Sequence, residues 1–289
     1  MAEKEYGNPD LGNDKDTSNT IVAAQNLRRP HSSKNGKHGK HGKHGKSGKS
    51  GKCPRKKCSK SSKTGKSSKS CKAKWTPLEN DHKARKIDAL SGCDDCVDEI
   101  SLGFDFRWMG GTNTINKVHV STNGQILINP GDANRSYSLR PIGTNNAPRI
   151  AVTQEDLDLR PDRQVYMKQE TDCSIIISYE DVAWYWYRSN KPEISAQAQI
   201  FADGSVNICF GAGGIINPYD SMASGIEAGV NDKVYDGPPV KAPLPRYPFD
   251  ADGVAREWPS EGSCYCFDPC TNTWSWTKNR HKAVQMELS

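Results

Sequence analysis

Lysines that recur at every third position near the N-terminus are the residues with the clearest chemistry in this chain. Glycine, serine, histidine and threonine fill most positions between them, so the segment has no apolar surface to bury and is expected to stay disordered. An even row of ammonium groups attracts dense polyanions, because binding releases the counterions of the polymer. The predicted polyanion-binding residues are Lys34, Lys37, Lys40, Lys43, Lys46, Lys49, Lys52, Lys60, Lys63, Lys66, Lys69 and Lys72.

Residues 1–74, here called the arm, carry most of the excess positive charge. Of the 40 Lys and Arg residues, 18 lie between Arg28 and Lys74, a stretch without Asp or Glu, and the other 22 share the rest of the chain with all 34 acidic residues. A basic arm on an acidic body indicates a polyanionic matrix or mineral surface as partner. Nucleic acid is the alternative, although this stretch has no aromatic residue on which bases could stack.

The ten cysteines indicate an oxidising compartment. No signal peptide is visible and no apolar run is long enough to span a membrane, yet we expect an extracellular or cell-wall location. Disulfides that join the flanks of the body are favoured over a four-thiolate zinc site, since Cys-x-Cys is not the usual zinc spacing. Cys173 and Cys209 could pair if their strands are neighbours. The disulfide candidates in the body are Cys93, Cys96, Cys173, Cys209, Cys264, Cys266 and Cys270.

Acidic residues cluster most densely at Glu155, Asp156 and Asp158. Asp156 and Asp158 are weak candidates for a divalent-metal site, because hard cations bind clustered oxygens. The alternative, which the absence of EF-hand spacing favours, is that both side chains cap a turn. A metal-dependent enzyme built around the two aspartates is therefore a second alternative function.

Four consecutive aromatic residues, Trp184, Tyr185, Trp186 and Tyr187, form a candidate interaction platform for a protein or glycan. In an extended strand, alternate members face opposite sides, so core packing on both sides competes with this interpretation. Asn134 begins the one glycosylation sequon that we find. No nucleophile, metalloprotease or phosphate-loop motif is present, so we predict neither an enzyme nor a cofactor.

Short strands separated by polar turns must position these groups. Asn123-Gly124 and Asp203-Gly204 are strong hairpin signals, and Val206, Ile208 and Phe210 share one face, as a half-buried strand requires. The pattern predicts an all-β, antiparallel sandwich with disulfide-braced flanks. The expected strands cover residues 102–108, 118–120, 125–128, 149–152, 165–168, 174–179, 194–201 and 205–210.

Several segments together resemble the nidogen-like domain. They are F-D-F-R-W-M-G-G from Phe104, K-V-H-V-S-T-N-G-Q-I-L-I from Lys117 and R-I-A-V-T-Q-E-D-L-D-L from Arg149, followed by the Ala196–Val206 hairpin and Ser224–Glu227. The resemblance covers roughly residues 100–230, with Val152 standing where the family often has proline. It implies an extracellular β domain of adhesion and matrix proteins, without catalytic residues to carry over.

The arm resembles the lysine clusters of diatom silica-associated, silaffin-like proteins, most closely over residues 60–72. This resemblance implies association with a silica wall or its organic matrix. We therefore predict a secreted or cell-surface adhesive protein whose arm binds a polyanionic matrix and whose β domain mediates interactions. The predicted domains are the arm at 1–74, a linker with Cys-x-x-Cys at 75–100, a nidogen-like sandwich at 101–236 and a Pro-rich, Cys/Trp-rich segment at 237–289.

Overall fold

A computed structural model describes the folded body of the chain. The described residues are 71–128, 142–143, 148–159, 163–185, 194–213, 221–228, 240–245, 248–255 and 257–277. The lysines of the arm up to Lys69, Asn134, Trp186 and Tyr187 lie outside them. Within the described residues all regular structure is β except two short 3-10 turns, η1 (Asp88–Leu90) and η2 (Trp108–Gly110), so the predicted all-β class is confirmed.

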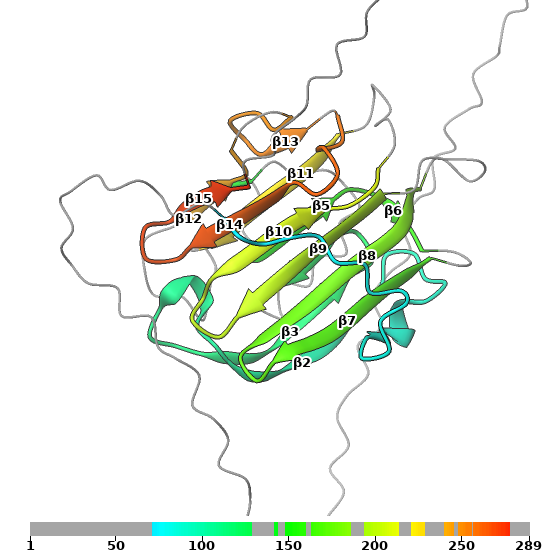
Figure 1. Ribbon diagram of the computed structural model, residues 1–289, viewed down its shortest axis with the longest axis horizontal. Helices are drawn as coiled ribbons and strands as arrows, with labels where there is room; N and C mark the ends of the chain where they lie inside the picture. Colours follow the sequence, from blue (N-terminus) through cyan, green and yellow to red (C-terminus); the bar gives the residue numbers. More distant parts are fainter. Residues whose placement is uncertain are drawn as a thin grey trace, which may run out of the picture. The chain divides into compact units, whose positions relative to one another are not determined.

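Two antiparallel sheets lie one on the other (Figure 1). In spatial order, sheet A contains β1 (Arg85–Lys86), β7 (Gln164–Thr171), β8 (Ser174–Trp184), β9 (Ile194–Phe201), β10 (Val206–Phe210), β14 (Cys264–Asp268) and β15 (Thr273–Trp276), with β6 (Leu157–Asp158) paired to β8. Sheet B contains β12 (Val240–Pro243), β11 (Met222–Ala228), β5 (Arg149–Gln154), β4 (Gln125–Leu127), β3 (Ile115–Ser121) and β2 (Val97–Phe106), with β13 (Val254–Ala255) paired to β11.

The core lies between the sheets, where alternate residues of each strand meet. Ile100, Leu102 and Phe104 of β2 are buried there, while Ser101 and Gly103 between them are exposed. Tyr179 of β8 joins the two layers, because its hydroxyl donates to the carbonyl oxygens of Ser121 at 2.9 Å and Gln125 at 3.2 Å. Complete burial raises the pKa of the Tyr179 phenol far above its usual range, so this hydroxyl remains a donor.

The predicted Asn-Gly hairpin joins β3 to β4, with Val120 opposite Ile126. Gly124 has a φ of 70°, and a Cβ at this position would lie 2.1 Å from the carbonyl oxygen of Thr153. Any other residue would therefore clash with β5 as well as adopt a disfavoured backbone conformation. The hairpin and the close approach of β5 together set the register of sheet B.

The segment from Cys71 to Lys86, here called the strap, crosses the outer face of sheet A (Figure 1). Leu78 is buried against Tyr166 and Ile176 on that face. The Glu180 carboxylate accepts the backbone N–H groups of Leu78 at 2.6 Å and Glu79 at 2.9 Å. The strap ends as β1, where it pairs with β7.

The C-terminal strands close the other side of the sandwich. β14 pairs with β10 and β15 adds to its outer side, so this hairpin extends sheet A. The Trp274 indole N–H donates to the carbonyl oxygen of Ala242 in β12 at 3.1 Å, which connects sheet A to sheet B. Phe210, Tyr265 and Trp258 pack their rings edge to face under this hairpin.

Candidate functional site

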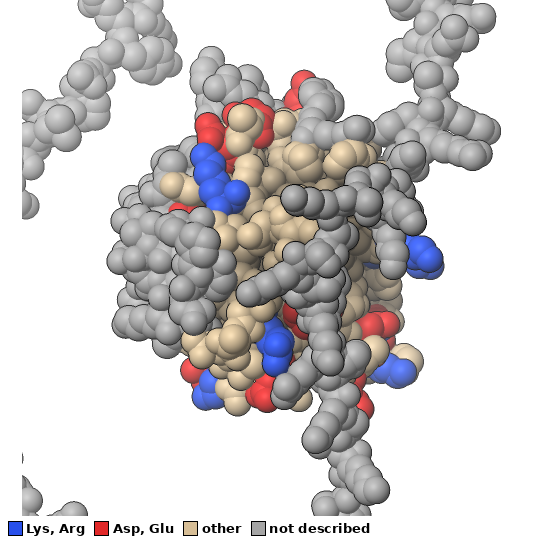
Figure 2. Space-filling view, turned by 90° about the vertical axis from the view of Figure 1, so that its left-hand side faces the viewer, with Lys and Arg blue, Asp and Glu red and all other residues tan. Residues whose placement is uncertain are grey.

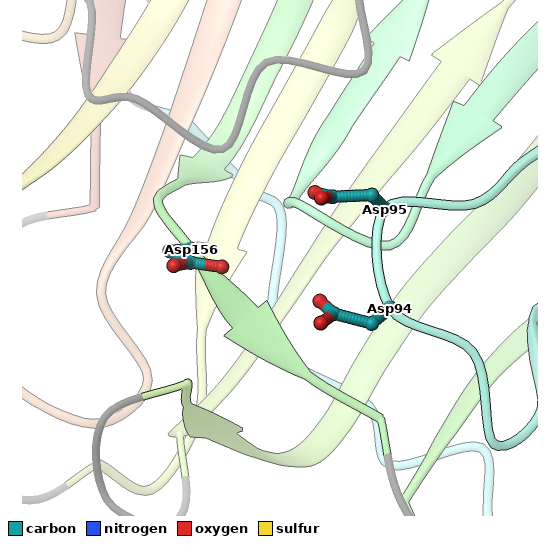
Figure 3. A group of neighbouring side chains, drawn as sticks. All are labelled: Asp94, Asp95 and Asp156. Atoms are coloured by element: carbon teal, nitrogen blue, oxygen red, sulfur yellow. The ribbon is translucent and has the colours of Figure 1, made fainter. Parts of the chain in front are cut away.

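Three aspartates from distant parts of the sequence gather at one end of the sandwich (Figure 3). Asp94 and Asp95 lie in the loop that precedes β2, and Asp156 lies between β5 and β6. One carboxylate oxygen of each lies within 4.8 Å of the other two, and all three residues are half-buried or nearly buried. Such oxygens are the ligands that Ca²⁺ and Mg²⁺ prefer, although Ca²⁺ normally takes about six to eight of them.

Local bonds hold the aspartates in this position. A disulfide between Cys93 and Cys96 closes the loop that contains Asp94 and Asp95. The Asn123 side chain links the two parts, since its amide donates to Asp95 Oδ1 at 2.7 Å and its oxygen accepts the Leu157 N–H at 3.2 Å. The hairpin residue Asn123 therefore positions the carboxylates as well as turning the chain.

The predicted metal candidates are only partly brought together. Asp156 belongs to the group of three, whereas Asp158 lies in β6 opposite Ala183. Sequence reasoning missed Asp94 and Asp95 as members, because about sixty residues separate them from Asp156. The sequence feature that could have indicated them is a pair of acidic residues inside a Cys-x-x-Cys loop.

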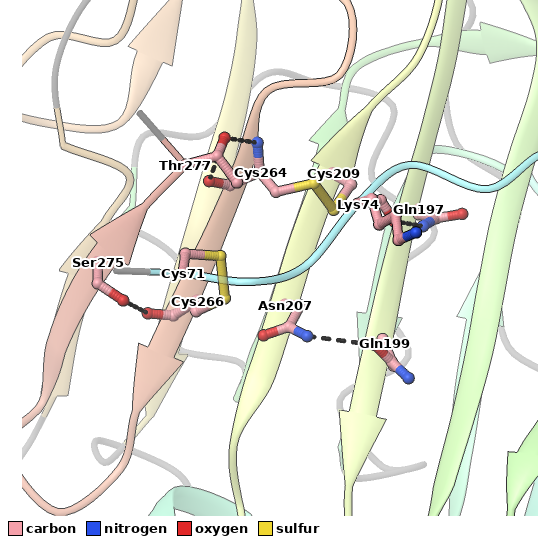
Figure 4. The surroundings of a disulfide bond; sticks show 10 residues. All are labelled: Cys71, Lys74, Gln197, Gln199, Asn207, Cys209, Cys264, Cys266, Ser275 and Thr277. Atoms are coloured by element: carbon pink, nitrogen blue, oxygen red, sulfur yellow. Dashed lines mark hydrogen bonds between the residues drawn. A yellow bond between two sulfur atoms is a disulfide. The ribbon is translucent and has the colours of Figure 1, made fainter. Parts of the chain in front are cut away.

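Two disulfides lie side by side on the outer face of sheet A (Figure 4). Cys209 of β10 stands opposite Cys264 of β14 and is bonded to it, and the next outward residue of β14, Cys266, is bonded to Cys71 of the strap. The chain upstream of Cys71 is thus covalently attached to the sandwich. The attachment lies on β14, almost at the other end of the chain.

The cysteine pairing corrects two sequence-based alternatives. Cys209 pairs with Cys264 and not with Cys173, because β10 is a direct neighbour of β14. A zinc site of body cysteines is also wrong, since Cys93, Cys96, Cys264 and Cys266 are all consumed in disulfides. Cys173 and Cys270 are disulfide-bonded as well.

The first residue of the aromatic run, Trp184, belongs to the core. Trp184 ends β8 and is only 1% exposed, so it is not part of a surface platform. Tyr185 is half-buried, and its N–H donates to the carbonyl oxygen of Asp156 at 2.9 Å. Trp186, Tyr187, the sequon residue Asn134 and the arm lysines up to Lys69 lie outside the described residues, whereas Lys72 is exposed at the start of the strap.

Charged side chains are interspersed with uncharged ones over the described surface in view (Figure 2). On the outer face of sheet B, one ion pair is buried: Arg149 Nη2 lies 3.2 Å from Glu227 Oε2. Burial raises the pKa of the Glu227 carboxyl, and the neighbouring Arg149 guanidinium partly offsets that shift. Gln125 and Gln154 accept further hydrogen bonds from the guanidinium.

A family model described as NIDO related matches residues 67–269, which is more than half of the chain. The match extends beyond the region 100–230 of the sequence resemblance and takes in the strap and β14. No curated protein and no solved structure matches the chain. Among the described residues, no helix has the length and apolar character needed to cross a bilayer.

Proposed function

Because the chain belongs to the NIDO-related family, we propose that it is a non-enzymatic adhesive protein of the extracellular matrix or cell wall. In this proposal the arm binds a polyanionic matrix, such as silica or a sulfated or phosphorylated polymer. The sandwich carries the surface that binds a protein or glycan partner. NIDO-related domains and disulfides are both typical of extracellular proteins.

The observation that carries the proposal is the covalent attachment of the arm to the sandwich. The lysine steps end at Lys72, directly beside Cys71, which is bonded to Cys266 of β14. The end of the arm is therefore fixed to β14 of sheet A by a disulfide as well as by the backbone. An arm that acted only as a solubilising linker would need no such attachment.

The distribution of basic and acidic residues along the chain also supports polyanion binding by the arm. Between Arg28 and Lys74 the arm carries 18 of the 40 basic residues of the chain and no acidic residue. Affinity for a polyanion should therefore come from the arm, and the body should contribute little to it. The even spacing suits a uniform polymer or mineral surface better than a specific site.

Binding of the full-length, oxidised protein to silica particles and to a sulfated polysaccharide tests the proposal. We expect the affinity to fall on the order of 1,000-fold between about 50 and about 200 mM salt, as counterion release requires. A variant with the twelve lysines of the two blocks replaced by glutamine should lose this binding. Equal binding of the variant would contradict the proposal.

Two measurements separate the nucleic-acid alternative from this proposal: a binding competition with DNA and the redox state of the native protein. Duplex DNA of matched charge should compete no better than the sulfated polymer if the arm recognises charge density alone. Protein from its native source should shift in mobility between reducing and non-reducing gels. A fully reduced native protein, or a strong preference for DNA, would favour the intracellular alternative.

A further inference from the structure

The two ends of the described chain converge on one strand. Cys71, the first described residue, is bonded to Cys266 in the middle of β14. Thr277, the last one, follows β15, and its N–H donates to the carbonyl oxygen of Cys264 at 2.9 Å. The Cys264 N–H in turn donates to Thr277 Oγ1 at 3.1 Å (Figure 4). The arm and the C-terminal segment therefore leave the sandwich from the same hairpin.

This convergence creates a short covalent path through the molecule. Along the backbone, the path from Cys71 to Thr277 passes through every strand of both sheets. Through the Cys71–Cys266 disulfide, the path needs only residues 266–277. Those residues, fully extended, span about 40 Å.

We propose that the Cys71–Cys266 disulfide makes the protein a transmitter of tension between the arm and the C-terminal segment. A pull applied to both segments passes through the disulfide and the β14–β15 hairpin. Residues 72–265, which form nearly the whole sandwich, lie outside this path and stay folded. A partner bound to the sandwich therefore stays bound while the chain is under load.

The hairpin that takes the load is itself braced. Cys264 is bonded to Cys209 of β10, directly beside the loaded residue Cys266. Trp274 of β15 donates to the carbonyl oxygen of Ala242 in sheet B. Peeling of β15 is thus limited to the few residues that follow Cys266, and β14 remains fixed to sheet A.

Without this disulfide, and where the disulfides of Cys173 and Cys270 do not carry the load, the same pull would act on the strap. The strap is held by the hydrogen bonds of Leu78 and Glu79 to Glu180, by the Gln197 side chain that donates to the carbonyl oxygen of Lys74 at 3.2 Å, and by the two residues of β1. These contacts would open one after another. Load would then pass into β2 and the core.

Single-molecule pulling on the full-length, oxidised protein, held by its two ends, tests the proposal. The wild-type protein is compared with a Cys71→Ser/Cys266→Ser variant, and both carry Cys270→Ser so that Cys270, in the same hairpin, offers no second route. The next covalent route includes at least residues 173–209 and 264–277, which extend to about 160 Å. We therefore expect the variant to reach a total extension at least about 100 Å longer than its parent.

A Cys93→Ser/Cys96→Ser variant is the matched control, because the short loop that this disulfide closes, with a sequence separation of 3, lies off the tension path. Its extension should equal that of the parent. A thiol reductant added under constant force should lengthen the parent protein in steps as the sandwich unfolds. Equal extensions of parent and Cys71→Ser/Cys266→Ser variant, or early unfolding of the oxidised parent, would overturn the proposal. The outcome does not depend on which polymer the arm binds, so it is separable from the proposed adhesion.

Discussion

On the outer face of sheet A, the strap runs across β14, β10, β9 and β8, whereas the outer face of sheet B carries a row of charged side chains. The strap is held by a disulfide, by apolar contacts of Leu78 and by hydrogen bonds to Glu180. On sheet B the buried groups include an ion pair, since Arg149 is completely buried beside Glu227. The two faces therefore depend on different physical terms.

The row on sheet B follows the register of its strands. Cross-strand partners place Glu99, His119, Leu127, Arg149, Glu227 and Lys241 in one line from β2 to β12. The ends are open to solvent, with side-chain exposures of 48% for Glu99 and 46% for Lys241, while Arg149 is at 0%. Opposite charges stand next to each other in the buried interior of the row, at Arg149 and Glu227, which offsets part of their desolvation.

The difference shows which change weakens each sheet. The covering of sheet A depends on a disulfide and therefore fails on reduction. A buried ion pair is insensitive to reduction but cannot lose one partner without leaving an uncompensated charge. Four predictions, from the largest expected effect to the smallest, sharpen this contrast.

Loss of the Cys71–Cys266 disulfide should destabilise the fold most. It closes a loop with a sequence separation of 195, so the Cys71→Ser/Cys266→Ser variant should lose about 5 kcal/mol of unfolding free energy. Removing Cys93–Cys96, with a separation of 3, should cost about 2 kcal/mol. Denaturant unfolding of both variants under oxidising conditions measures the difference, and equal losses would contradict the loop-entropy argument.

Replacing Arg149 by methionine should destabilise the protein by about 3 kcal/mol, because Glu227 is then buried without its counter-charge. The double variant Arg149→Met/Glu227→Met should recover most of this loss. Thermal unfolding of the single and double variants completes the cycle. If the double variant is less stable than Arg149→Met alone, the unpaired charge is not the cause.

Glu180→Gln should cost about 1–2 kcal/mol, because a glutamine has only one acceptor oxygen and one of the two backbone N–H groups of the strap then loses its acceptor. Hydrogen exchange should accelerate at Leu78 and Glu79 and stay unchanged in sheet B. Unchanged protection of both strap amides would show that Glu180 does not hold the strap.

Acid should weaken sheet B slightly through His119. Burial lowers the pKa of this imidazole below its usual 6.5, against the opposing effect of Glu99 and Asp98, while Lys117 acts with burial. The folded state therefore binds the proton less tightly than the unfolded state, so its contribution is complete above about pH 6.5 and is lost as the pH falls through the folded pKa. His119→Gln should make the free energy of unfolding less dependent on pH between pH 7 and 5, roughly the range in which histidine titrates. An unchanged pH dependence would exclude His119 as its cause.

Much of the sandwich was predictable from alternation and turns. The strands around residues 118–128, 149–152, 174–179 and 194–210 all occur, because each has one apolar face and ends at a turn such as Asn123-Gly124. β14 was not predicted. Its inward residues Tyr265 and Phe267 alternate with the outward cysteines Cys264 and Cys266, so the strand is apolar on both sides and shows no period of two.

The strap and the aspartate group could not be derived from local pattern. Residues 71–84 have no periodic apolar face, and their position depends on Cys266 and Glu180, which lie far away in sequence. Asp94 and Asp156 come together through tertiary structure, since Asn123 of the β3–β4 hairpin bonds both to Asp95 and to Leu157. Contacts of this kind are set by topology and not by spacing along the chain.

Trp75 gives the strap an optical signal of its own. Its indole packs against the cluster of Cys71, Cys209 and Cys264 and lies over the backbone of Gly211. Disulfides quench indole fluorescence on contact, so the two disulfides of this cluster are expected to lower the emission of Trp75. Reduction of both should therefore raise the emission of Trp75, which is one of seven tryptophans in the chain.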